Sequence, residues 1–130
     1  MYLGIDLGTS ALKVILIDED QNQLGEISIP FEVSRPQPLW SEQDPDLWWK
    51  ALIKAIQFLK TKKSFYDLKG IGLSGQMHGA VLMDKNGKIL RPAILWNDGR
   101  SGKECEELEE KEPDLKSITG NLAMPGFTAP

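Results

Sequence analysis

Cysteine, histidine, long apolar segments and basic residues are scarce in this chain of 130 residues, and each scarcity argues against a class of function. The single cysteine, Cys105, allows no internal disulfide and suits a reducing compartment, although a plain thiol on a helix surface would look the same. With one histidine as well, a zinc site would need carboxylates alone, which is improbable. Uncharged segments such as residues 70–83 are too short and glycine-rich to cross a bilayer, and the opening residues MYLGIDLGTS carry no export signal. We therefore expect a cytoplasmic protein with no membrane partner.

Basic residues are also in deficit, with 15 Lys and Arg against 19 Asp and Glu and a formal net charge of −4. A nucleic-acid partner is therefore not expected, because phosphate backbones need a basic surface. The GxxxxGK[ST] pattern and the nucleophile-elbow sequence are both missing, which excludes Walker-type and common hydrolase sites. What is present, 41% hydrophobic and 26% charged residues, is ordinary for one globular domain.

Apolar patterning predicts a mixture of strands and helices. Residues 2–6 and 12–17 are apolar runs separated by Gly-Thr-Ser, which indicates a hairpin, and residues 24–33 alternate as a half-buried third strand. Asp44-Pro45 is an N-cap followed by the proline typical of a first helical position, and the tryptophans after it are most simply core residues. Further expected elements are a strand over 70–74, a hairpin over 80–95 turning at Asn86-Gly87, an acidic helix over 100–112, and no completed element over 117–130.

Chemistry is first suggested at the turn of the amino-terminal hairpin, Asp6-Leu7-Gly8-Thr9-Ser10. A carboxylate ends the strand, glycine allows close approach of a ligand, and two hydroxyls with their backbone amides can donate to phosphate oxygens. Asp6 would then face a magnesium ion through water, because magnesium keeps several waters. The alternative is an ordinary hairpin whose aspartate and serine stabilise only the turn.

The second candidate site surrounds the single histidine. His78 lies between glycines in GLSGQMHGA, where an apolar run ends. A lone histidine beside an apolar run is most often a satisfied core residue. However, small-residue turns at strand ends are also where binding sites gather in sheet proteins. The residues alone leave both interpretations open.

Five segments together give the chain a family resemblance. They are GIDLGTSALKVILID, PLWSEQDPDLWW, GLSGQMHG, RPAILWNDGR and SITGNLAMPGFTAP, in that order along almost the whole chain. A DxGT turn alone would suggest only the wide actin, hexokinase and Hsp70 superfamily, whereas the SEQDP segment with QMHG is far more specific. In these segments the sequence closely resembles the amino-terminal part of the FGGY carbohydrate kinases.

The resemblance implies an α/β fold, a ribonuclease H-like mixed sheet with flanking helices, forming the amino-terminal part, residues 1–130, of the first of two domains. It also implies a sugar kinase that uses ATP and Mg²⁺. The family's phosphate turn maps onto Asp6, Gly8, Thr9 and Ser10, with Lys13 as a further basic residue. The sugar site maps onto Met77 and His78, with Trp96 as an apolar wall or a buried core residue. Asn97, Asp98 and Arg100 either support the residues that bind the sugar or, as we favour, form a turn and a helix cap.

Comparison with a neighbouring group narrows the implied substrate. Related glycerol kinases carry Arg-Glu at Met77-His78 and a tyrosine at Gly126, and loss of that tyrosine's bulk leaves space for a longer polyol. The expected substrate is a ketopentose, D-xylulose first, with L-xylulose and L-ribulose as alternatives.

The resemblance also implies that the 130 residues are inactive alone, since the family's general-base aspartate, second phosphate turn and adenosine pocket lie further along the chain. An incomplete core would expose an apolar edge, which leaves room for a homodimer. Two other functions stay open. A nuclease of the same fold would need a carboxylate cluster and a basic surface, and a non-catalytic module would bind only a sugar or a partner chain.

Overall fold

The computed structural model describes residues 1–61, 65 and 67–127, which form two compact units. We call residues 1–32 and 46–76 the sheet unit. Residues 33–45 and those from 77 to the end of the described chain are the loop unit. The chain passes from the first unit to the second at Val33 and again at Met77.

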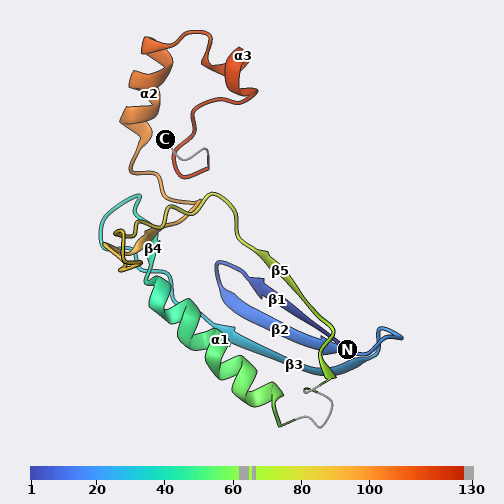
Figure 1. Cartoon of the computed structure of the whole chain (residues 1–130). Helices are drawn as coiled ribbons and strands as arrows, with labels where there is room; N and C mark the ends of the chain where they lie inside the picture. The colour runs from blue at the N-terminus through green and yellow to red at the C-terminus, as the bar shows by residue number, and fades with distance from the viewer. Residues whose placement is uncertain (62–64, 66, 128–130) are drawn as a thin grey trace. The chain divides into compact units, whose positions relative to one another are not determined.

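The sheet unit is a four-stranded mixed sheet with one helix on one face (Figure 1). Its strands are β1 (Tyr2–Leu7), β2 (Ala11–Ile17), β3 (Gln23–Pro30) and β5 (Gly70–Gly75), in the spatial order β3-β2-β1-β5. The pairs β1–β2 and β2–β3 are antiparallel, whereas β1 and β5 are parallel. The predicted hairpin and the strand over 70–74 are confirmed. The third strand ends at Pro30, not Val33, because after the Phe31 N–H bonds to the Ser10 carbonyl the chain leaves the sheet, and from Val33 it belongs to the loop unit.

The core of the sheet unit lies between the sheet and α1 (Pro45–Leu59), which begins where Asp44-Pro45 predicts. Alternate strand residues and every fourth helix residue supply it, as strand and helix periods require. Its fully enclosed members include Leu3, Leu12, Val14, Leu16, Ala55 and Leu59. The prediction that the helix tryptophans are core residues is wrong for Trp49, which is 64% exposed. Small alanines bring α1 close to the sheet along a narrow stripe, and Trp49 lies to one side of it.

The loop unit contains little regular structure. β4 (Glu42–Gln43) and β6 (Ala93–Ile94) form a two-residue antiparallel ladder. The predicted hairpin over 80–95 is reduced to single bridges, Ala80 with Ile94 and Met83 with Ile89, around the expected Asn-Gly turn. That turn is closed by Asp84, whose carboxylate accepts the backbone amides of Asn86 at 2.8 Å and Lys88 at 2.9 Å.

Two helices follow the ladder. α2 (Gly102–Lys111) confirms the predicted acidic helix, but its Cys105 is buried, so the interpretation as a surface thiol is wrong. α3 (Leu115–Thr119) contradicts the prediction that residues 117–130 hold no element; residues 128–130 lie outside the described chain. Gly120 ends α3 with φ +77°, the left-handed conformation that stops helices. Among the described residues, no helix is both long enough and apolar enough to span a membrane.

Candidate functional site

The turn between β1 and β2 is closed by backbone contacts. The Gly8 N–H donates to the Ala11 carbonyl at 3.0 Å, and the Phe31 N–H donates to the Ser10 carbonyl at 2.8 Å. A Cβ at Gly8 would lie 3.2 Å from the Ala11 oxygen, so glycine is favoured here by close approach of the backbone. The predicted phosphate turn is therefore a well-defined, small-residue loop.

The same turn is tied to the residue that follows β5. Because β1 and β5 are parallel, their carboxyl ends lie together at one edge of the sheet. The Thr9 hydroxyl donates to Gln76 Oε1 at 2.8 Å, and the Gln76 N–H donates to the Leu7 carbonyl at 2.8 Å. Gln76 Nε2 is buried and makes no hydrogen bond within the described part of the chain. The link between Thr9 and Gln76, 67 residues apart, was not part of the sequence prediction.

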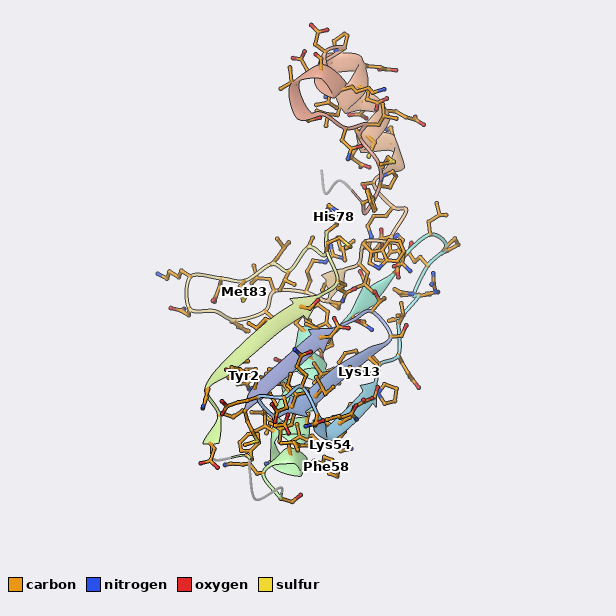
Figure 2. All side chains as sticks on the ribbon, turned by 90° about the vertical axis from the view of Figure 1, so that its right-hand side faces the viewer. Tyr2, Lys13, Lys54, Phe58, His78 and Met83 are labelled. Atoms are coloured by element: carbon orange, nitrogen blue, oxygen red, sulfur yellow. The ribbon has the colours of Figure 1, made fainter. Side chains whose placement is uncertain are left out.

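Asp6 lies near the end of β1, on the sheet face opposite α1, and its side chain is exposed. Its register neighbours are Lys13 on β2, labelled in Figure 2, and Ser74 on β5. Lys13 pairs with Glu26 at 3.4 Å, and over the residues described no hydrogen bond or ion pair reaches the Asp6 carboxylate. Asp6 and these two neighbours line a shallow hollow of about 280 Å³, where the paired glycines Gly4 and Gly72 supply no side chains.

His78 is an exposed residue of the loop unit, so the alternative of a satisfied core histidine is wrong. Its φ of +59° is left-handed, which is uncommon for any residue with a side chain. The ring lies against Phe127, with 4.7 Å between centroids and 35° between the ring planes. Strained backbone of this kind concentrates at functional sites.

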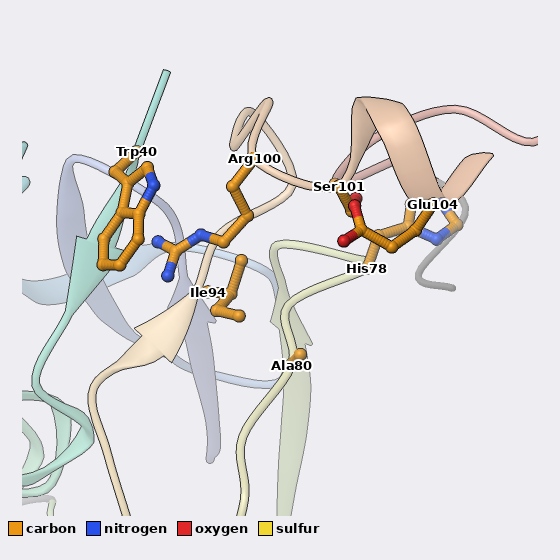
Figure 3. A pocket seen from close by; sticks show the side chains of 8 residues that line it. Trp40, His78, Ala80, Ile94, Arg100, Ser101 and Glu104 are labelled. Atoms are coloured by element: carbon orange, nitrogen blue, oxygen red, sulfur yellow. The ribbon is translucent and has the colours of Figure 1, made fainter. Parts of the chain in front are cut away.

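A cavity of about 400 Å³ opens beside His78 in the loop unit (Figure 3). Its lining is Trp40, His78, Ala80, Ile94, Arg100, Ser101, Glu104 and Gly126. An imidazole, a carboxylate, a hydroxyl and a guanidinium beside an indole are groups that can bind the hydroxyls and carbons of a polyol. Met77 and Trp96 are not part of this lining; they are 59% and 39% exposed, so the alternative of a buried core Trp96 is wrong.

A buried ionic cluster holds the wall of this cavity. Arg100 donates to both carboxylate oxygens of Asp98, through Nε at 2.8 Å and Nη2 at 2.6 Å, and its Nη1 lies 2.8 Å from Glu42. Glu42 also pairs with Arg91 at 2.7 Å. The guanidinium carbon of Arg100 lies 3.7 Å from the ring centroid of Trp40, a cation–π contact visible in Figure 3.

Hydrogen bonds between Asp98 and backbone groups complete the cluster and fix the turn before α2. Asp98 accepts the backbone N–H groups of Ser41 at 2.6 Å and Arg100 at 2.9 Å. Its own N–H donates to the Leu95 carbonyl at 3.0 Å, so the predicted turn is confirmed. The predicted helix cap is wrong, because the N-cap of α2 is Ser101 and no side chain caps it.

The electrostatics of the cluster follow from these contacts. Burial acts to raise the pKa of Asp98, but the hydrogen bonds from the side chain and backbone of Arg100 and from the Ser41 amide together lower it below its ordinary value. The hydrogen bond to Asp98 raises the pKa of Arg100 against the opposing effect of burial. Both groups are therefore charged at neutral pH.

Gly126 is held where no other residue fits. Its φ is +68°, and a Cβ there would lie 2.5 Å from the carbonyl oxygens of both Trp96 and Asp98. Glycine at this position allows the segment to pack directly on the 96–98 turn. Sequence reasoning missed Trp40, Glu42, Arg91, Glu104 and Phe127, since nothing in their local sequence shows what they contact.

The two groups of predicted site residues fall in different units. Asp6, Gly8, Thr9, Ser10 and Lys13 belong to the sheet unit. Met77, His78, Trp96 and Gly126 belong to the loop unit. The boundary passes between Gln76 and Met77, inside the QMHG segment.

Comparison with known proteins gives a consistent result. The model of the FGGY family of carbohydrate kinases, N-terminal domain, matches residues 1–130. The xylulose kinase of Escherichia coli (strain K12) is 55% identical over 130 residues, which is all of this chain and 27% of that protein. A solved structure of a xyloylose kinase from Brucella ovis matches with TM-score 0.89 and 53% identity over 97% of this chain and 27% of its own. Plasmodium falciparum glycerol kinase with ADP matches with TM-score 0.86 and 26% identity over 98% and 26%. The chain thus spans about a quarter of the length of these proteins.

Proposed function

The chain belongs to the FGGY family of carbohydrate kinases, and from this we propose that it is the amino-terminal part of an ATP-dependent kinase of D-xylulose. The complete enzyme would transfer the γ-phosphoryl group of ATP to a terminal hydroxyl of the sugar, giving the 5-phosphate. The fold, a mixed sheet with helices, is that of the actin, hexokinase and Hsp70 superfamily. The observation that carries the proposal is 55% identity to a xylulose kinase over the whole chain.

In the sheet unit, the residues around Asp6 support the proposal of a nucleotide and magnesium site. Asp6 offers one exposed carboxylate beside a hollow, and the described residues hold no group of three His, Cys, Asp or Glu that could enclose a metal ion. A single carboxylate suits a hydrated magnesium ion, which keeps most of its waters. Magnesium, when bound with ATP, neutralises the charge that develops on the transferred group. Gly8, Thr9 and Ser10 would orient phosphate oxygens through their N–H and O–H groups, with Lys13 adding positive charge.

In the loop unit, the residues around His78 support the proposal of a sugar site. His78 would hydrogen-bond substrate hydroxyls, Met77 would give an adaptable apolar contact, and Trp96 would lie against sugar carbons. The cavity beside His78 adds Glu104 as an acceptor for hydroxyl protons. The exposed position of His78 beside this cavity supports the proposal that it binds substrate hydroxyls.

We further propose that residues 1–130 alone do not catalyse the transfer. Phosphoryl transfer depends on positioning two substrates and stabilising charge between them, so one wall of a cleft retains almost none of the rate. The family resemblance implies that the aspartate accepting the hydroxyl proton lies beyond these residues.

A chimaera tests the proposal directly. This chain replaces the matching 130 residues of the E. coli xylulose kinase, and ADP release is measured with ATP, Mg²⁺ and D-xylulose, L-xylulose, L-ribulose or glycerol. We expect turnover selective for D-xylulose in the chimaera and none in the 130-residue chain. Selectivity for another ketose would correct the substrate, and a folded chimaera that releases no ADP with any ketose would contradict the proposed function.

A further inference from the structure

Few polar contacts restrict the orientation of the His78 imidazole. Across the described residues no hydrogen bond or ion pair reaches it, and the side chain is exposed on a left-handed backbone. An exposed ring free to rotate would lose that freedom when a sugar binds, which lowers affinity. A residue that fixes the ring beforehand would remove this cost.

Phe127 is the residue placed to do so. Its ring centroid lies 4.7 Å from that of His78, with the planes tilted by 35°. This separation is within the range at which aromatic rings attract each other. The contact joins two segments distant in the sequence, and it leaves the cavity-lining side of His78 available.

Gly126 makes the contact possible. The Phe127 N–H donates to the Pro125 carbonyl at 2.7 Å, a tight turn centred on Gly126. That turn packs against the carbonyls of Trp96 and Asp98, where a Cβ would lie 2.5 Å from each oxygen. The Asp98–Arg100 ion pair, 2.6 Å between Nη2 and Oδ2, in turn fixes the position of those carbonyls.

We propose that Phe127 is a positioning residue for sugar recognition, which holds the His78 ring ready for substrate hydroxyls, and that Gly126 is required to bring it there. The proposal that the ligand is a sugar rests on the proposed function. The ring contact itself does not depend on it.

The contact can be tested in the 130-residue chain by NMR, because the sequence has a single histidine and its ring protons are unambiguous. Removing the neighbouring ring in Phe127→Leu should shift both His78 ring-proton signals to those of a histidine without an aromatic neighbour. Gly126→Ala should shift them in the same direction. The matched control is Phe58→Leu, a 45% exposed phenylalanine of the sheet unit, which should leave them unchanged. Unmoved signals in Phe127→Leu would overturn the proposal.

The functional consequence is measured in the chimaera. Phe127→Leu should raise KM for D-xylulose roughly 3- to 10-fold, the cost of ordering one side chain on binding, with KM for ATP unchanged. Phe127→Tyr, which keeps the ring, should restore the low KM. A merely structural role would alter both KM values or the amount of folded protein, and an unchanged sugar KM would also refute positioning. A chimaera inactive before substitution would refute the proposed function, and the NMR result would then decide the contact alone.

Discussion

The sheet unit and the loop unit are stabilised by different interactions. In the sheet unit, leucines, Val14 and small helix residues form an apolar core between strands and α1. In the loop unit, the buried polar side chains of Ser41, Glu42 and Asp98 lie within a network that includes Arg100. Apolar burial is non-directional, whereas an ionic cluster is stable only when every partner is in place.

This difference affects how each group of candidate site residues is held in place. A regular sheet gives the proposed phosphate turn a fixed base, while the directional contacts of the loop unit set the geometry of short segments with few ladder hydrogen bonds of their own. Substitutions in the two units should therefore differ in how far their effects spread.

The largest effect is expected in the sheet core. Leu16 is fully buried on β2, and Leu16→Ala leaves a cavity, so we expect a loss of about 4 kcal/mol in the free energy of unfolding. Urea denaturation measures it. The matched control, Leu73→Ala on β5, removes a side chain that is 79% exposed and should cost less than about 1 kcal/mol. Equal losses would contradict the placement of the core.

Asp98→Asn should have the next largest effect. It leaves Arg100 largely buried without its main partner, which should cost about 3 kcal/mol. Amide hydrogen exchange should accelerate in residues 39–42 and 95–100, while β1 and β2 keep their protection. Asp84→Asn changes a loop carboxylate that accepts the backbone amides of Asn86 and Lys88, and it should change exchange much less. Loss of protection throughout the sheet would refute the separation of the two units.

Acidification should weaken the loop unit through the same carboxyl. Because the pKa of Asp98 is lower when folded than when unfolded, its contribution is complete above the unfolded value of about 4 and is lost as the pH falls through the folded value. In the sheet unit, hydrogen bonds from the side chain and backbone of Asn22 lower the pKa of Asp18, but that group is on the surface. Exchange protection of the loop unit should thus fall in acid, with a weaker dependence in Asp98→Asn. Identical pH profiles for both proteins would be the contrary result.

The smallest effect is expected at the surface of α2. Lys103 is 82% exposed and lies 3.7 Å from Glu107, one helical turn later. Exposed pairs of this kind contribute about 0.5 kcal/mol or less. Lys103→Ala should therefore leave the urea midpoint almost unchanged, and a loss above 1 kcal/mol would show that the pair has a larger role.

The same contrast explains how far the sequence could be interpreted. The hairpin, α1 and β5 are local patterns of period two or 3.6, so they can be predicted, and motifs indicate Asp6 and His78 as candidate site residues. The cluster around Arg100 could not, because Glu42, Arg91 and Asp98 come from three segments whose meeting depends on tertiary structure. Trp49 is exposed although periodicity predicts a core residue, because periodicity indicates which face of the helix is buried but not how wide the buried face is. The αL cap at Gly120, which ends α3, is a signal that could have been used.

The most direct test of the account compares one variant from each unit in the chimaera, with D-xylulose and ATP varied in turn. Asp6→Asn should lower kcat by a factor on the order of 10³, as expected when charge stabilisation is lost. His78→Ala should chiefly raise KM for D-xylulose, and Asp20→Asn, an exposed carboxylate of the β2–β3 loop, should change neither. Near-normal kcat in Asp6→Asn, or an unaltered sugar KM in His78→Ala, would contradict the assignment of phosphate to the sheet unit and sugar to the loop unit.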